Sequence, residues 1–189
     1  MSRLWRAYLH LLNTHPIKVQ GITTGALICV GDVLAQQFVE KKGLHGHDYA
    51  RTIRQGIFGV VFVGPVMISW YRVLDRLYPG TGKLVPLYKV ATDQVIFAPF
   101  IITCFMSFVA FGRGKTATEV KDQLSADFIP TLLTAYKIYP ALQIFNFYIA
   151  PLNLRPVVVN VVSIFWNTYL SWISNNPTIQ EVAVTKDTT

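Results

Sequence analysis

Four stretches of this chain carry no charged residue and are each long enough to cross a membrane as a helix. They cover residues 55–71, 94–112, 138–154 and 156–180 and hold 17, 19, 17 and 25 residues. A helix that crosses hydrocarbon needs roughly 17–25 residues. A fifth run, 19–31, holds 13 residues and stops at Asp32, so a span there requires a sheltered carboxylate. The pattern predicts an all-α integral membrane protein folded as a helical bundle.

The scarcity of charge supports lipid as the solvent. Charged residues make up 14% of the 189 residues, whereas an average soluble domain has about 25%. The net charge is +7, and the bases form short clusters between the hydrophobic runs. Such clusters suit anionic lipid head groups. Nucleic-acid binding would want a contiguous basic stripe or a known module. We therefore predict membrane lipid as a partner and no direct binding of nucleic acid.

We expect one membrane domain over residues 1–173, followed by a polar, disordered tail over 174–189. The four predicted spans are about 17–39, 52–73, 87–111 and 128–149. A fifth hydrophobic helix, about 156–173, is left open as a span. Pro65, Pro99 and Pro140 fall inside three spans and are expected to kink them, because each removes a backbone donor.

The first 16 residues predict a basic amphipathic helix. No acidic residue precedes Asp32, and Arg3 and Arg6 lie beside apolar residues at helical spacing. Such a helix suits a membrane interface. Mitochondrial targeting helices share this acid-free character, although this segment is poor in serine.

Polar side chains recur at helical spacing within several spans, so they share one face of each helix. An ionised aspartate at the bilayer centre costs roughly 2.5–3.5 kcal/mol. We therefore expect these faces to converge inward, away from lipid. Lys137 lies off this face and is expected to pair with Asp93 or to reach the membrane surface. The predicted polar lining consists of Asp32, Gln36, Asp93, Gln143, Asn146 and Asn167.

Two interpretations of these faces remain open. Hydrogen bonds between packed helices would account for them, at about 0.6 kcal/mol each. A water-lined path for small solutes would also use them, and four helices with a polar face favour that path. Gly21 and Gly25, four residues apart, predict close helix packing. Cys29 and Cys104 are expected inside spans, where thiols usually only pack; a redox-sensing role is the alternative.

Catalysis is not predicted. Gly114-Lys115-Thr116 lacks the upstream glycine of a phosphate-binding loop. His45, His47 and Asp48 are weak metal ligands in a short loop. No paired carboxylates or Ser-His-Asp arrangement can be assembled from the sequence. We predict a protein that is no enzyme and that holds no metal or cofactor.

The order and spacing of many short elements resemble the peroxisomal membrane protein (twenty-two kilodalton) and Mpv-seventeen family over about residues 3–173. One position departs from the family pattern, because Ile68 stands where many relatives carry histidine. The matching elements are His15-Pro16, Gly31-Asp32 with Gln36, Arg51-Thr52 with Arg54, Gly64-Pro65, Trp70-Tyr71, Asp93-Gln94 with Pro99, Pro140, Gln143, Asn146-Phe147, Pro151, Arg155 and the run from Trp166 to Trp172.

The resemblance implies a four-span protein, described in the family as a non-selective channel. Its closest branch implies the mitochondrial inner membrane, with roles in membrane potential, mitochondrial homeostasis and mitochondrial DNA maintenance. The peroxisomal branch implies a pore in the peroxisomal membrane. A structural membrane scaffold, acting as a homo-oligomer or within a complex, is the alternative from another class. A carrier is disfavoured because no repeated half is evident.

Overall fold

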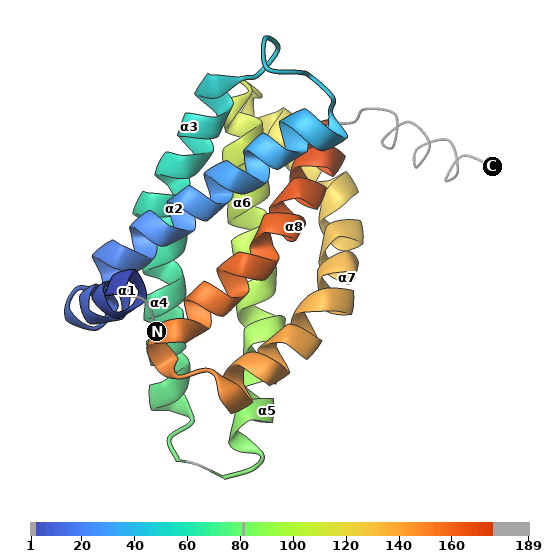
Figure 1. Cartoon of the computed structure of the whole chain (residues 1–189). Coiled ribbons are helices and arrows are strands. Elements are labelled where there is room, and N and C mark those ends of the chain that lie inside the picture. Colours follow the sequence, from blue (N-terminus) through green and yellow to red (C-terminus); the bar gives the residue numbers. More distant parts are fainter. Residues whose placement is uncertain (1–2, 81, 176–189) are drawn as a thin grey trace.

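The computed structural model describes residues 3–80 and 82–175 and contains no strand in those ranges. After the N-terminal helix α1 (Arg3–Thr14), five helical rods alternate in direction (Figure 1). They are α2 (Pro16–Leu34) with η1 (Ala35–Val39); α3 (Tyr49–Phe58), η2 (Gly59–Val63) and α4 (Gly64–Leu77); α5 (Val85–Thr92), η3 (Asp93–Phe97) and α6 (Ala98–Gly112); α7 (Ala117–Ile149); and α8 (Arg155–Asn175), preceded by the short 3-10 turn η4 (Leu152–Leu154).

Three of these rods are long and apolar enough to cross a membrane. They run over Pro16–Val39, Tyr49–Leu77 and Val85–Gly112, with 24, 29 and 28 residues. The predicted spans 17–39, 52–73 and 87–111 fall within them, so the all-helical membrane class is confirmed. The apolar part of α8 that is described, Val157–Trp166, is shorter. Crossing of the membrane by the fourth rod stays a prediction, and crossing by the fifth rod stays open.

The fourth rod begins well before the predicted span at 128. Thr116 and Glu119 form a capping box, in which each side chain bonds the other's backbone N–H. That arrangement satisfies free N–H groups at a helix start, and α7 therefore starts at Ala117. At the other end of the chain, α8 continues to Asn175, two residues into the predicted tail. Residues 176–189 lie outside the described part.

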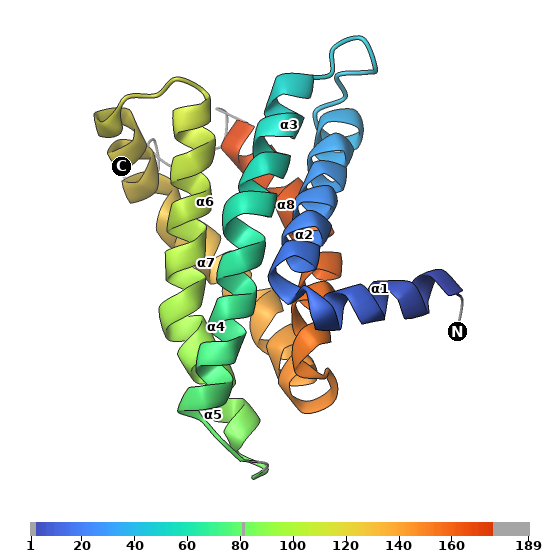
Figure 2. The ribbon, with the colours of Figure 1, turned by 90° about the vertical axis from the view of Figure 1, so that its left-hand side faces the viewer.

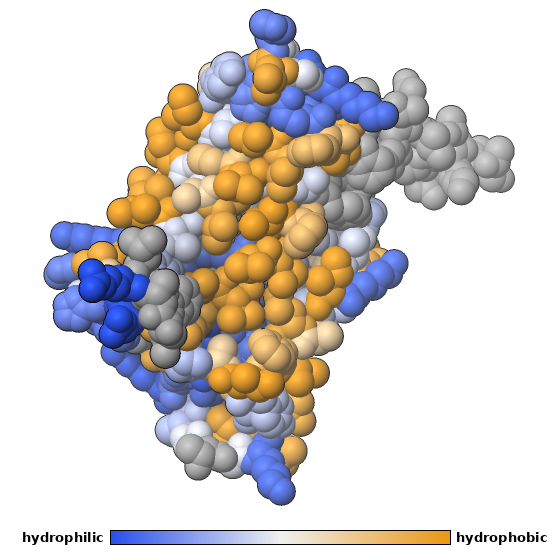
Figure 3. All heavy atoms as spheres, viewed as in Figure 1, coloured by the Kyte–Doolittle hydropathy of each residue, from blue (hydrophilic) through white to orange (hydrophobic). Residues whose placement is uncertain are grey.

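The outer surface of the bundle matches a membrane environment. Figure 3 shows apolar side chains over its middle, with hydrophilic residues gathered towards its ends. Large apolar groups such as Ile22, Phe38 and Val95 are exposed; in water, an apolar patch of this kind would mark an interaction surface. The predicted basic N-terminal helix is α1, which extends sideways from the foot of α2 (Figure 2).

Two π-helical segments stand just upstream of prolines. Pro65 and Pro99 cannot donate to the carbonyl four residues back. In η2 the N–H of Gly64 donates to the carbonyl of Gly59, and in η3 the N–H of Ala98 donates to that of Asp93. Each bond reaches five residues back, which widens the turn. Pro130 and Pro140 lie inside α7. The expected kinks at Pro65, Pro99 and Pro140 stay a prediction.

Glycines let α2 approach the second rod closely. A Cβ atom at Gly21 would lie 2.6 Å from the carbonyl oxygen of Val60, and one at Gly25 would lie 2.7 Å from that of Gly56. Only hydrogen fits at these distances. The two glycines that the sequence assigns to helix packing thus lie on the contact between the two rods.

Gly25→Val is expected to destabilise the bundle, because the added carbons would meet the backbone of Gly56. Overpacking costs typically about 1–3 kcal/mol, and a backbone neighbour cannot yield as a side chain does. Thermal unfolding of the detergent-solubilised protein would measure the loss. Ala26→Val is the matched control, because Ala26 is exposed on the same helix. Equal unfolding temperatures for the two variants would contradict the prediction.

Candidate functional site

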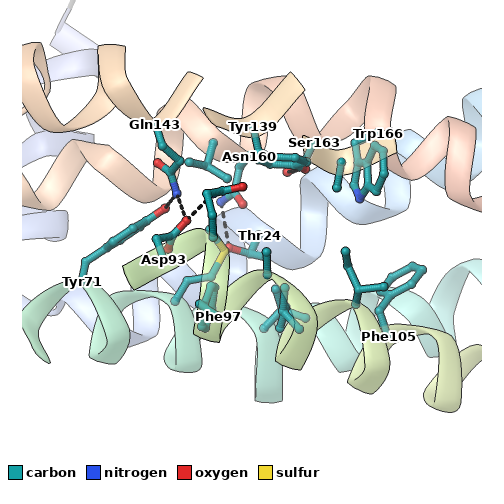
Figure 4. A pocket seen from close by; sticks show the side chains of 18 of the residues that line it. Thr24, Tyr71, Asp93, Phe97, Phe105, Tyr139, Gln143, Asn160, Ser163 and Trp166 are labelled. Carbon is teal, nitrogen blue, oxygen red and sulfur yellow. Dashed lines mark hydrogen bonds between the residues drawn. The ribbon is translucent and has the colours of Figure 1, made fainter. Parts of the chain in front are cut away.

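An internal cavity of about 100 Å³ lies among all five rods. A water molecule needs roughly 10–15 Å³ of such space, so the cavity has room for several. Most of its wall is apolar or aromatic. Figure 4 shows Asp93, Gln143 and Tyr71 at one end and Phe105 and Trp166 at the other. The polar side chains on the wall are Thr24, Tyr71, Asp93, Gln94, Tyr139, Gln143, Asn160 and Ser163.

Asp93 is the central ionisable group of this cavity. Asp93 is the first residue of the π-helical segment η3 and is 2% exposed. Its Oδ1 accepts a hydrogen bond from Trp70 Nε1 at 2.9 Å. Its Oδ2 accepts from Gln143 Nε2 at 2.8 Å and from Gln94 Nε2 at 2.9 Å. All three donors are neutral. Within the described ranges no basic nitrogen pairs with this carboxylate.

Polar side chains continue from Asp93 towards the lower end of the bundle, which carries residues 78–80, 82–84 and 150–154. Asn146 Nδ2 donates to Gln143 Oε1 at 3.0 Å and to the carbonyl of Arg155 at 3.3 Å. Asp75 Oδ1 then pairs with Arg155 at 2.7 Å and with Lys89 Nζ at 2.6 Å. We call this series the lower polar ladder. It joins the cavity to the charged edge of the bundle.

Buried oxygens without a partner occur along the same route. Gln94 Oε1 and Asn146 Oδ1 accept no hydrogen bond from any described residue. Gln94 lies on the cavity wall. Leaving a buried acceptor unsatisfied costs about 1–3 kcal/mol. A water molecule inside the cavity would offset that cost at Gln94.

The end of the cavity opposite Asp93 is packed with apolar side chains. Phe105 and Trp166 line this end (Figure 4). Met106 and Val109 continue this packing towards the upper end, which carries residues 40–48 and 113–116. We call this cluster the apolar barrier. Its buried members are Ile102, Phe105, Met106, Val109, Ala135 and Trp166.

A second polar network lies beyond the barrier, at the upper end. Asp32 is fully buried, and its Oδ1 accepts from Arg51 Nε at 2.8 Å. Its Oδ2 accepts from Gln36 Nε2 at 2.8 Å and from Thr52 Oγ1 at 2.6 Å. Arg51 also donates to both carboxylate oxygens of Glu40, from Nη1 to Oε2 at 3.1 Å and from Nη2 to Oε1 at 2.9 Å. This network supplies the shelter that a span through Asp32 requires.

The pKa of the Glu40 carboxyl group reflects two opposing effects at the upper end, burial and neighbouring positive charges. Burial raises the pKa of its carboxyl group, but hydrogen bonds from Arg51 and Lys42 outweigh burial and hold that pKa below its usual value. Glu40 therefore stays ionised at neutral pH. The guanidinium of Arg51 is in consequence neutralised by two carboxylates.

The structure separates the predicted lining residues into groups. Asp93 and Gln143 lie on the cavity wall, and Asn146 bonds to Gln143 just below it. Asp32 and Gln36 belong to the upper network instead. All five are buried. The side chain of the sixth, Asn167, lies outside the described part of the chain.

The two cysteines are free thiols. Cys29 Sγ lies 3.6 Å from the carbonyl oxygen of Thr52 and packs over Gly56. Cys104 is partly buried on α6. Among the described residues, no three His, Cys, Asp or Glu side chains gather to hold a metal ion. A redox role for Cys29 and Cys104 stays a prediction.

Sequence reasoning missed several members of these sites. Arg51 was not predicted as the partner of Asp32, yet it is buried in the first turn of α3 and donates to that carboxylate. Trp70 and Gln94 were not predicted as partners of Asp93. Of the two alternatives for Lys137, pairing with Asp93 is wrong, because Lys137 is exposed and the donors to Asp93 among the described residues are all neutral.

The pattern that defines the Mpv17 / PMP22 family matches residues 110–171. The mitochondrial inner membrane protein Mpv17 of Xenopus laevis is 48% identical over 175 residues, which cover 93% of this chain and 99% of that protein. The chain belongs to the Mpv17 / PMP22 family. The human protein of the same name is 45% identical over 169 residues, covering 89% of this chain and 96% of that protein. Protein sym-1 of Neurospora crassa is 39% identical over 169 residues, covering 88% and 96%.

Membership in the Mpv17 / PMP22 family confirms the resemblance read from the sequence motifs. The predicted location, the mitochondrial inner membrane, is confirmed as well. Relatives at 45% and 48% identity carry that location in their names, and three helices of this chain can cross a membrane. No solved structure shows a significant match to the chain.

Proposed function

We propose that this member of the Mpv17 / PMP22 family is a small-solute channel of the mitochondrial inner membrane, with Asp93 in its path. One observation carries the proposal: a buried carboxylate without a basic partner faces a cavity between membrane-spanning helices. An ionisable group at membrane depth is costly and usually marks an ion or substrate pathway. If the polar side chains served only to hold the helices together, neither the cavity nor the unpaired carboxylate of Asp93 would be required.

In this proposal the path has two halves. The lower polar ladder, from Asp75 through Asn146 to Gln143, hydrates the half between the lower end and the cavity. The apolar barrier closes the other half. Hydrophobic constrictions gate channels by excluding water. The structure then corresponds to a closed channel, which opens when the barrier parts and becomes wet.

Asp93 gives the proposed path a preference for cations. At the lower end Arg155 and Lys89 are both paired with Asp75, so their charges are partly neutralised. Cation flow across the inner membrane lowers its potential. We propose that contributions to membrane potential, mitochondrial homeostasis and mitochondrial DNA maintenance follow from such gated flow. None of these roles requires catalysis.

Asp93→Asn is expected to reduce the cation preference, because the amide keeps the size of the side chain and removes its charge. A unit charge at 4 Å is worth about 1 kcal/mol even in water, or roughly fivefold in a permeability ratio. The reversal potential of the purified protein in a planar bilayer under a KCl gradient would measure this ratio. Asp122→Asn, at an exposed position of α7, is the control. An unchanged ratio would exclude Asp93 from the path.

The alternative, a structural membrane scaffold in a homo-oligomer or a larger complex, uses the same buried networks for assembly only. Liposomes that contain the purified protein and trapped solutes of graded size separate the two functions. A channel releases solutes up to a sharp size limit. A scaffold leaves every solute trapped, and cross-linking would then capture one stable protein partner.

A further inference from the structure

Arg54 is a partly buried cation without a carboxylate partner. It lies on α3, and its guanidinium rests on the end of α6, where a Cβ at Gly112 would be 2.6 Å from Arg54 Nε. Arg51, one turn earlier, is held by Asp32 and Glu40. Across the described ranges, no acid and no hydrogen-bond acceptor pairs with Arg54. The positive charge of Arg54 is therefore available to a ligand.

Arg113 brings a second positive charge to the same corner. It follows Gly112 directly and caps α6. Burial lowers the pKa of its guanidinium, and the like charges of Arg51 and Arg54 lower this pKa further against the opposing effect of Glu40. Since Arg113 directly follows Gly112, on which the Arg54 side chain rests, the two arginines belong to one corner of the bundle. Arginine is well suited to phosphate, because its planar fork matches the phosphate oxygens.

An apolar seam begins directly below these two arginines. Phe58, one turn after Arg54, stacks on Phe108 of α6 with ring centroids 4.0 Å apart. Phe62 continues the seam, 5.0 Å from Phe58 and 6.5 Å from Phe100. Figure 2 shows the second rod and α6 side by side on this face. On the seam Phe100 is 47% exposed, and Ile57 and Phe111 beside it are 58% and 54% exposed, so this face is open to lipid.

We propose that Arg54, with the positive charge of Arg113 beside it, binds the phosphate of an anionic phospholipid whose acyl chains lie along the seam of Phe58, Phe62, Phe100 and Phe108. Positive charge above exposed apolar surface complements a lipid, which has phosphate above hydrocarbon. Two guanidiniums favour a head group without a cation of its own. A free phosphate offers the same oxygens but nothing to cover the seam. This site does not depend on the channel function.

Native mass spectrometry of the full-length protein in detergent tests the site with defined lipids. Equal amounts of dioleoyl phosphatidylglycerol and dioleoyl phosphatidylcholine are added, and inorganic phosphate is added in a separate arm. We expect the first bound lipid to be phosphatidylglycerol. Arg54→Gln should weaken its binding about tenfold, the size expected when one charge-assisted hydrogen bond is lost. Arg76→Gln, at an exposed position near the lower end, should change it less than about twofold.

Three outcomes would overturn the lipid site. The first is equal binding of the two lipids to the unaltered protein, which needs no variant to fold. The second is unchanged phosphatidylglycerol binding in a folded Arg54→Gln protein. The third is displacement of the lipid by millimolar inorganic phosphate, which would assign the corner to a soluble anion. Arg54→Lys, which keeps the charge without the fork, should retain an intermediate affinity.

Discussion

Replacing Arg51 with glutamine is expected to lower the free energy of unfolding by about 3–5 kcal/mol, because it leaves the buried carboxylate of Asp32 without a counter-charge and Glu40 with Lys42 alone. Arg51 is only 5% exposed and Asp32 is fully buried. The guanidinium holds Asp32 at 2.8 Å and Glu40 at 2.9 Å. It thereby ties the start of α3 to the end of α2, and both helix ends should loosen together.

Thermal unfolding of the full chain in one detergent would measure this loss. Lys121→Gln removes a base from an exposed position of α7 and should stay within about 0.5 kcal/mol of the unaltered protein. Adding Asp32→Asn to Arg51→Gln should recover part of the stability, because one uncompensated charge disappears. If Arg51→Gln unfolds at the same temperature as Lys121→Gln, the ion pair does not stabilise the bundle.

The burial of Asp32 could be predicted from sequence, but its partner could not. Helical period and the cost of charge in lipid both required the carboxylate to face inward. Arg51 lies at the edge of a hydrophobic run, where a base normally reaches the membrane surface. The packing of α3 against α2 brings Arg51 inward, where its guanidinium supplies the counter-charge of Asp32. Nothing in the spacing of one sequence identifies that pair.

The expectation of one common polar centre was too simple. The period of a helix gives the face of a residue, whereas its depth follows from its distance along the rod at about 1.5 Å per residue. Asp32 comes late in Pro16–Val39 and Asp93 comes early in Val85–Gly112. These two rods run in the same direction, so the carboxylates lie towards opposite ends. Counting depth from the sequence would have predicted two networks.

Gln143 supports the same reasoning from a rod of opposite direction. It lies late in α7, which descends while the rod of Asp93 ascends. The two residues therefore meet near the lower end, 2.8 Å apart. The partners Trp70 and Gln94 depend on finer geometry. Gln94 directly follows Asp93 in η3 and donates to its carboxylate at 2.9 Å. The segment η3 ends two residues before Pro99.

Adding a polar group to the apolar barrier is expected to raise solute flux by about tenfold. Met106 is buried there in one cluster with Phe105 and Val109. Met106→Gln keeps an unbranched side chain of similar length and adds an amide that water can hydrate. A hydrophobic gate then becomes easier to wet, and about 1.4 kcal/mol less barrier gives a tenfold faster passage. Potassium efflux from liposomes that contain the purified protein would measure the change.

Met106→Leu is the matched control, because it alters shape at the same position without adding polarity. It should leave efflux near that of the unaltered protein, whereas a general loosening of the core would raise efflux in both variants. Unfolding temperatures of the two variants identify such loosening directly. If neither variant nor the unaltered protein releases potassium, the proposed channel function fails and the scaffold is favoured.

Combining Met106→Gln with Asp93→Asn tests whether gate and selectivity belong to one path. If ions pass the barrier and then the cavity, the double variant should keep the raised flux of Met106→Gln and lose its cation preference. The two effects should be independent, because the apolar barrier sets the rate of passage, whereas Asp93 sets how strongly cations are preferred over anions. A raised flux that stays equally cation-selective without Asp93 would mean that ions cross by a route outside the cavity. The carboxylate would then be a packing group held by Trp70, Gln94 and Gln143.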